Sequence, residues 1–295
     1  MYRNENVNTV TSDKIKKKKK KAKRRKIAWF FLKLFLVAVL FVSLVLFLTK
    51  AQFFNVNSIE VYGVERLNAD EIKTTAGILP GVNDFKELGS NMNGFSLKNL
   101  VLLRYAKQER HLQDTYPYIK SVKVVYKPPQ KVEIRIVERK PSVKIKSADK
   151  YILIDEDGFI LEQLPADEQI SLLELKGIDL SNSYPGQFIE EKYQDKLENF
   201  FELMDKLNES DELEGQEPKI IPLLKSVNVT DTMELKIVMQ PALLVNLGKI
   251  NDIDNRRLEV LRYLYKNNIK DGKGYLDFSS SSDPTYDANG YKEQE

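Results

Sequence analysis

The sequence predicts an α+β protein with a single N-terminal transmembrane helix, a first small domain and a second mixed, strand-rich α+β domain. Three observations predict this class: one uninterrupted apolar segment near the N-terminus, a strand–helix–helix–strand–strand order behind it, and a longer region of recurring short β-branched runs. The predicted parts are a basic cytoplasmic tail at 1–26, a transmembrane helix at 27–49, a first domain at 50–141, a second domain at 142–280 and a flexible tail at 281–295.

The apolar segment is long enough to cross a membrane. It runs from Ile27 to Leu48, and its 22 residues form a helix of about 33 Å, compared with roughly 30 Å for the hydrocarbon core of a bilayer. A signal peptide has a shorter apolar region and a small-residue cleavage site, whereas bulky residues lie on both sides of Ala51. Lys33 lies close enough to the basic end to reach the lipid head groups. We therefore expect an uncleaved membrane anchor.

A basic block precedes the anchor, with eleven Lys or Arg between Lys14 and Lys26. Because basic residues are retained on the cytoplasmic side, we expect the N-terminus inside and everything after Lys50 outside, as in a single-pass type II protein. Binding to anionic lipid, at about 1 kcal/mol per basic residue, is expected too. Nucleic-acid binding is the alternative, but the block is short, abuts the anchor and lacks aromatic residues for base stacking. The residues expected to set orientation and contact lipid are Lys16, Lys17, Lys18, Lys19, Lys20, Lys21, Lys23, Arg24, Arg25 and Lys26.

The net charge of +3 combines two parts of opposite sign. Residues 1–49 hold 13 Lys or Arg against Glu5 and Asp13, which leaves 33 basic and 41 acidic side chains in the rest of the chain. The part expected outside is therefore mildly acidic, and about 245 residues suffice for one large or two small domains. The chain has no cysteine, which is compatible with the exterior of a Gram-positive bacterium.

The first domain begins with "VNSIEVYGV", a β-branched run that predicts a strand. Asn68 and Glu71 form a capping-box pattern that opens a helix, and Gly77 ends it. A second helix is predicted at about 96–113, where leucines recur near helical spacing.

The clearest pattern in the chain is the hairpin "YIKSVKVVYKPPQKVEIRIVERKP", in which apolar and charged residues alternate on both sides of Pro128 and Pro129. Such alternation places the apolar side chains on one buried face. The predicted buried face consists of Val122, Val124, Val132, Ile134 and Ile136. We expect a small sheet covered by two helices.

Strand signals dominate the second domain. Asp157 and Gly158 predict a hairpin turn between strands at 151–154 and 159–161. Apolar residues at helical spacing predict helices at about 190–207 and 252–267. Further strands are predicted at 226–229, 233–239, 243–247 and 274–278, the last being "GYLDF".

The sequence offers no pattern typical of an enzyme, a metal site or a cofactor site. The sole histidine, His111, lies among polar residues and supports neither a histidine-based triad nor a site with several histidine ligands. The "DEDG" at 155–158 is similar to part of a calcium loop, but Leu153 and Leu164 occupy two ligand positions, so a turn is predicted. The Ser-x-x-Lys spacing at 147–150 lacks the Lys-Thr-Gly and Ser-Asp-Asn motifs of penicillin-binding enzymes.

Several segments, in this order, resemble the FtsQ/DivIB family of bacterial cell-division proteins: the basic tail and anchor, "FNVNSIEVYGVERLNADEI", "GILPGVNDF", the hairpin and "YILIDEDGFIL". The resemblance extends from the anchor to about Phe278 and implies that the first external domain is a POTRA domain. It also implies a non-enzymatic divisome scaffold at the septum of the cell membrane. Such a scaffold binds DivIC/FtsB-like and FtsL-like single-pass proteins, has septal peptidoglycan synthases as further candidate partners, and helps control septal peptidoglycan synthesis.

The resemblance places the main docking surface at the C-terminal end of the second domain, where "GYLDF" is the last predicted strand. A last strand is often an edge whose free N–H and C=O groups pair with an incoming strand. Tyr275, Asp277 and Ser279 would then share the partner-binding face, while Leu276 and Phe278 would face the core. Two alternatives stay open: the strand only closes a sheet, or the protein is a membrane-anchored cell-wall hydrolase or synthase.

Overall fold

The computed structural model describes residues 5–83, 103–269, 272–280 and 283–290. The chain divides into two compact units, one comprising Met1–Tyr62, Lys73–Gln108 and Lys123–Arg135, the other Gly63–Ile72, Glu109–Val122 and Ile136–Glu295. Because this division passes through helices and strands of the predicted first domain, the domain boundaries proposed from the sequence remain predictions.

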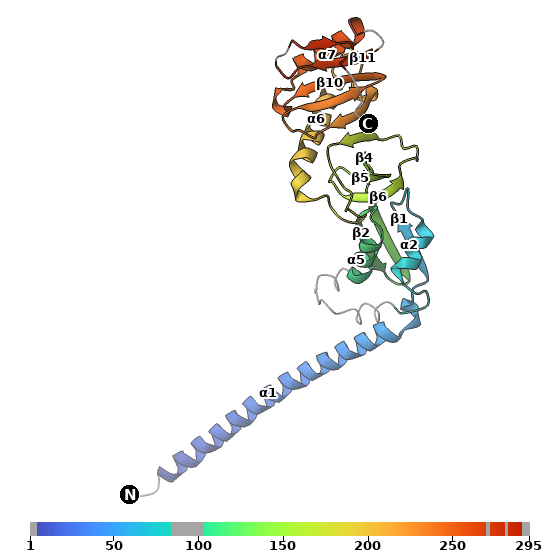
Figure 1. Ribbon diagram of the computed structural model, residues 1–295. Helices are drawn as coiled ribbons and strands as arrows, with labels where there is room; N and C mark the ends of the chain where they lie inside the picture. Colours follow the sequence, from blue (N-terminus) through green and yellow to red (C-terminus); the bar gives the residue numbers. More distant parts are fainter. Residues whose placement is uncertain (1–4, 84–102, 270–271, 281–282, 291–295) are drawn as a thin grey trace. The chain divides into compact units, whose positions relative to one another are not determined.

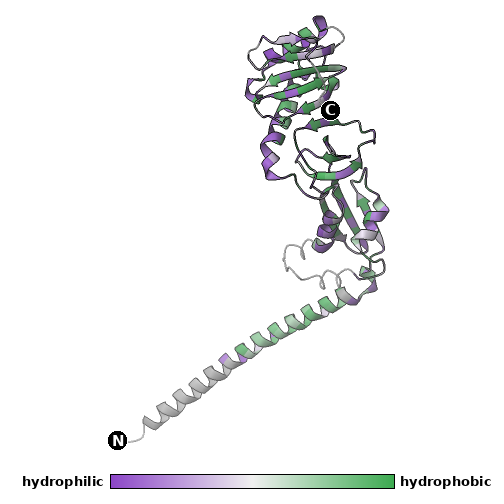
Figure 2. Ribbon diagram, viewed as in Figure 1, coloured by the Kyte–Doolittle hydropathy of each residue, from purple (hydrophilic) through white to green (hydrophobic). Residues whose placement is uncertain are grey.

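Helix α1, Glu5–Lys50, contains the predicted membrane anchor (Figure 1). Its apolar part, Arg25–Leu48, has 24 residues, and none of its most apolar stretch is buried by the protein. Figure 2 shows most of this part of α1 in the colour of hydrophobic residues. Exposed apolar side chains along a helix long enough to cross a bilayer are consistent with a membrane anchor.

The first sheet has the strand order β1–β3–β2, formed by Ser58–Tyr62, Lys131–Glu138 and Ile119–Lys127. β1 runs parallel to β3, with Ile59 opposite Val132 and Val61 opposite Ile134. All five side chains of the predicted buried face of the β2–β3 hairpin are at most 5% exposed. The register predicted from the alternation of apolar and charged residues is therefore confirmed.

The described residues of this part of the chain include the helices α2, Ala69–Ala76, and α5, Ala106–Thr115. The Asn68 side chain accepts hydrogen bonds from the backbone N–H groups of Asp70, at 2.8 Å, and Glu71, at 3.4 Å, as the capping pattern predicts.

The predicted helix at 96–113 is wrong in part. Its first residues lie outside the described residues, and residues 103–105 are not helical. Tyr105 donates to the carbonyl of Val124, and Tyr126 donates to the carbonyl of Leu103, each at 2.9 Å. This short segment pairs with the edge of β2, so α5 begins only at Ala106.

In the part of the chain that the structure describes, the second sheet has nine strands, in the order β12–β11–β10–β9–β8–β7–β4–β5–β6. The pairs β4–β7, β7–β8 and β10–β11 are parallel, and the other pairs are antiparallel. The strands are Val143–Ser147, Lys150–Ile154, Ile160–Pro165, Leu173–Lys176, Leu224–Asn228, Leu235–Met239, Ala242–Gly248, Lys273–Asp277 and Thr285–Asp287, from β4 to β12.

Helices α6, Gln194–Glu212, and α7, Asn255–Asn267, pack their apolar side chains into one core with this sheet. Asp254 caps α7 by accepting from the backbone N–H of Arg257 at 2.8 Å. Asp211 in α6 accepts from the Arg262 guanidinium in α7 at 2.6 Å and from the backbone N–H groups of Ile220 and Ile221. This buried ion pair fixes the end of α6 to α7.

Ile134→Asp is expected to open the β2–β3 hairpin, because the side chain is 0% exposed and burying an unpaired carboxylate costs several kcal/mol. Val137→Asp is the matched control, since Val137 lies in the same strand with 56% of its surface exposed. Hydrogen exchange of the β2 and β3 amides in the full-length protein measures the effect. Equal loss of protection in both variants would contradict the register.

Candidate partner-binding face

The predicted partner-binding residues lie on β11 and just after it. Tyr275 and Asp277 are half-buried and Ser279 is exposed, whereas Leu276 and Phe278 are fully buried in the core. The alternation of the two faces along "GYLDF" is therefore as predicted.

The position of this strand in the sheet is not as predicted, because β11 is not the edge. β12 pairs with it antiparallel, with Tyr275 opposite Asp287 and Asp277 opposite Thr285. The tail predicted to be flexible therefore contains a strand at Thr285–Asp287, and β12 ends the sheet among the residues that the structure describes.

Gly274 provides the physical reason for this correction. A Cβ atom at Gly274 would lie 2.7 Å from the Asp287 carbonyl oxygen and 2.9 Å from the Tyr286 ring. Since glycine has no side chain, Tyr286 can lie over β11, and its hydroxyl donates to the carbonyl of Lys273 at 2.8 Å. The Gly274–Tyr286 contact holds the tail against the sheet. The pattern of apolar residues in the sequence does not predict this contact.

The register brings polar residues of four strands into one row: Lys236 of β9, Asn246 of β10, Asp277 of β11 and Thr285 of β12. Tyr275 lies in the neighbouring row, opposite Asp287. We call Tyr275, Asp277 and Ser279, together with Lys236, Asn246, Thr285 and Asp287, the polar face.

Several contacts set the charges of the polar face. Partial burial alone would raise the pKa of Asp277, but hydrogen bonds from Ser279, with a backbone N–H at 2.8 Å, and the charge of Lys236 lower that pKa overall. The hydrogen bond to Glu234 raises the pKa of Lys236. Burial, together with the charge of Asp277, raises the pKa of Tyr275. At neutral pH the polar face therefore presents a carboxylate, an ammonium group and a phenol that can donate a hydrogen bond.

The structure describes the side chains of only three of the ten basic residues predicted to contact lipid. Lys23, Arg25 and Lys26 are exposed on α1, in keeping with contact to solvent or lipid. The side chains of the other seven residues predicted to contact lipid lie outside the described ones, so their role remains a prediction.

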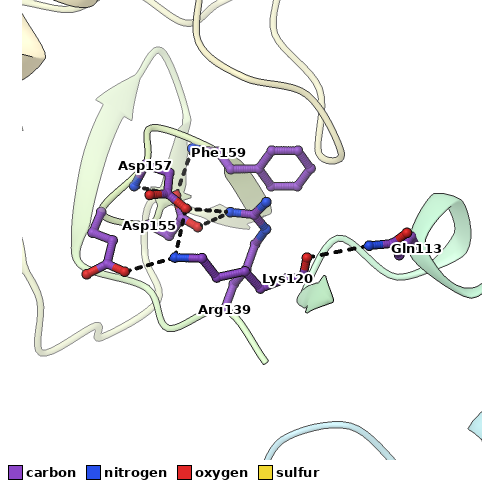
Figure 3. A network of polar contacts seen from close by, with 7 residues as sticks. Gln113, Lys120, Arg139, Asp155, Asp157 and Phe159 are labelled. Atoms are coloured by element: carbon purple, nitrogen blue, oxygen red, sulfur yellow. Dashed lines mark hydrogen bonds and ion pairs between the residues drawn. The ribbon is translucent and has the colours of Figure 1, made fainter. Parts of the chain in front are cut away.

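The acidic turn at 155–158 belongs to a partly buried polar cluster, drawn in Figure 3. The guanidinium of Arg139 donates to Asp155 at 2.5 Å and to Asp157 at 3.2 Å, and it lies 4.0 Å from the centre of the Phe159 ring. Asp155 also accepts from the backbone N–H groups of Asp157 and Phe159. The Asp155 side chain is only 2% exposed and that of Arg139 10%, so each charge depends on the other for its partner.

Lys120 completes this cluster at the surface. Its ammonium group lies 2.9 Å from Asp157 and 3.0 Å from Glu156, and the Lys120 hydrogen bond lowers the pKa of Asp157. The "DEDG" segment is thus a turn that binds two cations of the chain itself. Arg139, in "ERKP" directly after the hairpin, was not predicted as a member of this site. The pattern that could have indicated it is a basic residue directly after a strand, with the acidic "DEDG" turn further along the chain.

The structure also shows the surroundings of the His111 and Ser-x-x-Lys motifs. His111 is exposed on α5. The Ser147 hydroxyl is buried without a hydrogen-bond partner, so Lys150 does not contact it as an activating base would. Among the described residues no cluster of three or more metal-ligating side chains occurs.

A groove of about 670 Å³ lies beside α6, at the start of β4, β7 and β8. Apolar side chains of α6, including Phe200 and Met204, line it together with Lys144 and Lys225. A glycosidase-type site needs two carboxyl groups, and the described residues that line this groove include none. The groove therefore gives no support to a cell-wall hydrolase.

An exposed apolar helix of membrane-spanning length, followed by a small β1–β3–β2 sheet and a strand-rich sheet, defines the class of an α+β protein with a candidate N-terminal membrane anchor. Residues 89–139 match the family model described as POTRA domain, FtsQ-type. The chain is 27% identical over 237 residues to the cell division protein DivIB of Clostridium acetobutylicum, covering 80% of this chain and 84% of that protein.

Further relatives agree with this match. Identity to the cell division protein DivIB of Clostridium botulinum strain Hall is 26% over 257 residues, 85% of this chain and 90% of that protein. Identity to the cell division protein FtsQ of Novosphingobium aromaticivorans is 30% over 125 residues, 42% of this chain and 34% of that protein. The chain is thus similar to bacterial cell division proteins named DivIB along most of its length and to FtsQ over a shorter part, and these names support a role in cell division.

Arg139→Met is expected to destabilise the protein by about 3–5 kcal/mol, because it leaves the Asp155 carboxylate buried without its cation. Lys120→Met removes a neighbouring cation that is partly exposed, so solvent screening should leave stability nearly unchanged. Urea unfolding of the two purified variants, followed by circular dichroism, compares them. Similar losses in both would show that burial of the Arg139–Asp155 pair does not determine its importance.

Proposed function

We propose that this protein is a non-enzymatic divisome scaffold that holds other single-pass division proteins outside the membrane. In this proposal its partners are DivIC/FtsB-like and FtsL-like proteins, and through them it helps control septal peptidoglycan synthesis. The observation that carries the proposal is the combination of an exposed anchor helix with sequence similarity to DivIB along most of the chain. The names of these relatives are those of division proteins rather than of enzymes.

The polar face is the proposed docking surface for these partners. It combines directional groups with a nearby strand edge: Tyr275 and Asp277 offer a phenol and a carboxylate, and the exposed strand β12 ends the described part of the sheet. Strand addition supplies main-chain hydrogen bonds, while alternate side chains supply specificity. The proposal therefore differs from the sequence-based expectation in one respect: the incoming strand pairs with β12 rather than β11, and the polar face provides the side-chain contacts.

Tyr275→Ala combined with Asp277→Ala is expected to weaken partner binding at least tenfold, about 1.4 kcal/mol, because it removes both directional groups of the face. Calorimetry with the external segment of a DivIC/FtsB-like partner measures the affinity. The melting temperature should change little, because both side chains are half-exposed and the core residues Leu276 and Phe278 are retained.

The matched control removes the same two residue types elsewhere in the second sheet's unit, with Tyr184→Ala and Asp167→Ala. Both side chains are exposed, and neither lies in a strand of the polar face. Equal affinities of the two double variants would exclude the polar face as the docking surface. Release of muropeptides from peptidoglycan by the purified protein would contradict the scaffold proposal itself and favour a hydrolase.

The proposed orientation, with the N-terminus inside, is tested separately. A phosphatase that is active only outside the cytoplasm should be active when fused after Glu295 and inactive when fused before Lys14, because the basic block is retained inside. Alkaline phosphatase activity of intact cells, at matched expression, provides the measurement. Reversed activities would overturn the orientation and with it the external location of the polar face.

A further inference from the structure

The C-terminal end of α1 is capped by a side chain that lies far along the sequence. The amide nitrogen of Asn83 donates to the carbonyl oxygens of Leu48, at 3.1 Å, and Ala51, at 2.9 Å. The last carbonyl groups of a helix have no partner within the helix, and near a membrane an unsatisfied carbonyl is costly. Asn83 is only 9% exposed, so this cap is largely shielded from solvent.

Backbone hydrogen bonds hold the segment that carries Asn83 beside the residues that follow α1. Val56 donates to the carbonyl of Val82 at 3.0 Å, and Gly81 donates to the carbonyl of Val56 at 2.8 Å. The chain before Val56 is held as well, because the Tyr126 hydroxyl donates to the carbonyl of Phe54 at 3.1 Å. The end of the anchor helix and the loop at 78–83 therefore form one connected structure.

Two large apolar side chains of this structure point into solvent. Phe53 is 61% exposed and Leu79 is 68% exposed, although neighbouring residues Val56 and Ile78 are buried. Phe53 packs edge-on against Phe54, which in turn packs against Phe47 of α1. We call Phe53 and Leu79 the apolar collar, since both lie on segments bound to the end of α1.

The length of α1 and the short connection after it limit how far Phe53 can lie from the bilayer surface. The 24 residues of Arg25–Leu48 span about 36 Å, slightly more than the roughly 30 Å of a hydrocarbon core. Phe53 follows five residues later in the short 3-10 turn Gln52–Phe54, so its backbone lies within about 10 Å of Leu48. The head-group layer on each side of a bilayer is about 5–8 Å thick. Phe53 therefore cannot lie far from this layer if α1 crosses the membrane.

We propose that the apolar collar inserts into the lipid interface at the C-terminal end of α1 and fixes the adjoining segments, 51–56 and 78–83, against the bilayer. The proposal rests on the membrane insertion of α1 in the proposed function. The bilayer is the occupant because the collar continues the lipid-facing surface of α1, and aromatic side chains favour the interface. Asn83 acts as a positioning residue, because its two hydrogen bonds tie the Leu79 loop to the helix end.

Single tryptophans test this insertion in the full-length protein reconstituted into phosphatidylcholine and phosphatidylglycerol vesicles. The natural Trp29 is first replaced by Phe, and tryptophan is then introduced by Phe53→Trp, Leu79→Trp or, as a control, Tyr263→Trp. Tyr263 is 63% exposed on α7, which belongs to the other compact unit. Lipids brominated near the head-group end of their acyl chains quench only tryptophans that reach the interface.

The proposal expects blue-shifted emission and a large loss of fluorescence for the Phe53→Trp and Leu79→Trp proteins, and little loss for the Tyr263→Trp protein. Quenching of both collar positions no stronger than that of the control would overturn it. Flotation of the vesicles distinguishes this failure from failure of anchoring, because a protein that does not float with lipid has no inserted α1. Adding Asn83→Ala should reduce the quenching of the Leu79→Trp protein, and unchanged quenching would overturn the positioning role of Asn83.

Discussion

Arg139 directly follows the last residue of β3, and its guanidinium lies between the carboxylates of Asp155 and Asp157. Neither Arg139 nor Asp155 has access to enough water to be solvated alone, so the chain after β3 can take few positions that keep both charges paired. The backbone N–H of Arg139 also donates to the carbonyl of Tyr118, which binds it to the start of β2. The exit from the hairpin and the β5–β6 turn are thus held together by the ion pairs that Arg139 makes with Asp155 and Asp157.

Further polar contacts support the same region. Glu138 accepts hydrogen bonds from the backbone N–H groups of Glu65, Arg66 and Leu67. Glu162 of β6 accepts from Arg66 and from the Tyr118 hydroxyl, and burial together with this bond raises the pKa of Tyr118. Because these contacts link the segment 63–72 and the start of β2 to β6, they explain why these residues belong to the same compact unit as the large sheet. These contacts hold β6, at one end of the second sheet, whereas the polar face lies near the other end, at β9–β12.

The polar face shows how a small residue determines the use of a surface. If β11 were the edge of the sheet, its main chain would be open to a partner, and its side chains would be only part of the contact. Gly274 allows Tyr286 to lie across β11, so the tail occupies that edge and offers β12 in its place. This moves the strand edge one position outward, while Tyr275 and Asp277 stay half-exposed beside it. At the end of α1, Asn83 donates to the carbonyl of Leu48, in the last turn of the helix, and to that of Ala51, just after it.

The sequence by itself determined the features that depend on neighbouring residues. The length and composition of 27–48 established a membrane-length helix, the period of two in the β2–β3 hairpin identified its buried face, and Asp157–Gly158 located a turn. Only the tertiary structure decided the parallel pairing of β10 with β11, the cover that β12 provides, the Arg139–Asp155 pair and the Asn83 cap. These contacts join residues that are far apart in the chain or depend on the absence of a side chain at Gly274. Periodicity and turn chemistry report only on the local backbone, so they contain no record of which distant groups satisfy a buried charge, a free carbonyl or an open strand edge.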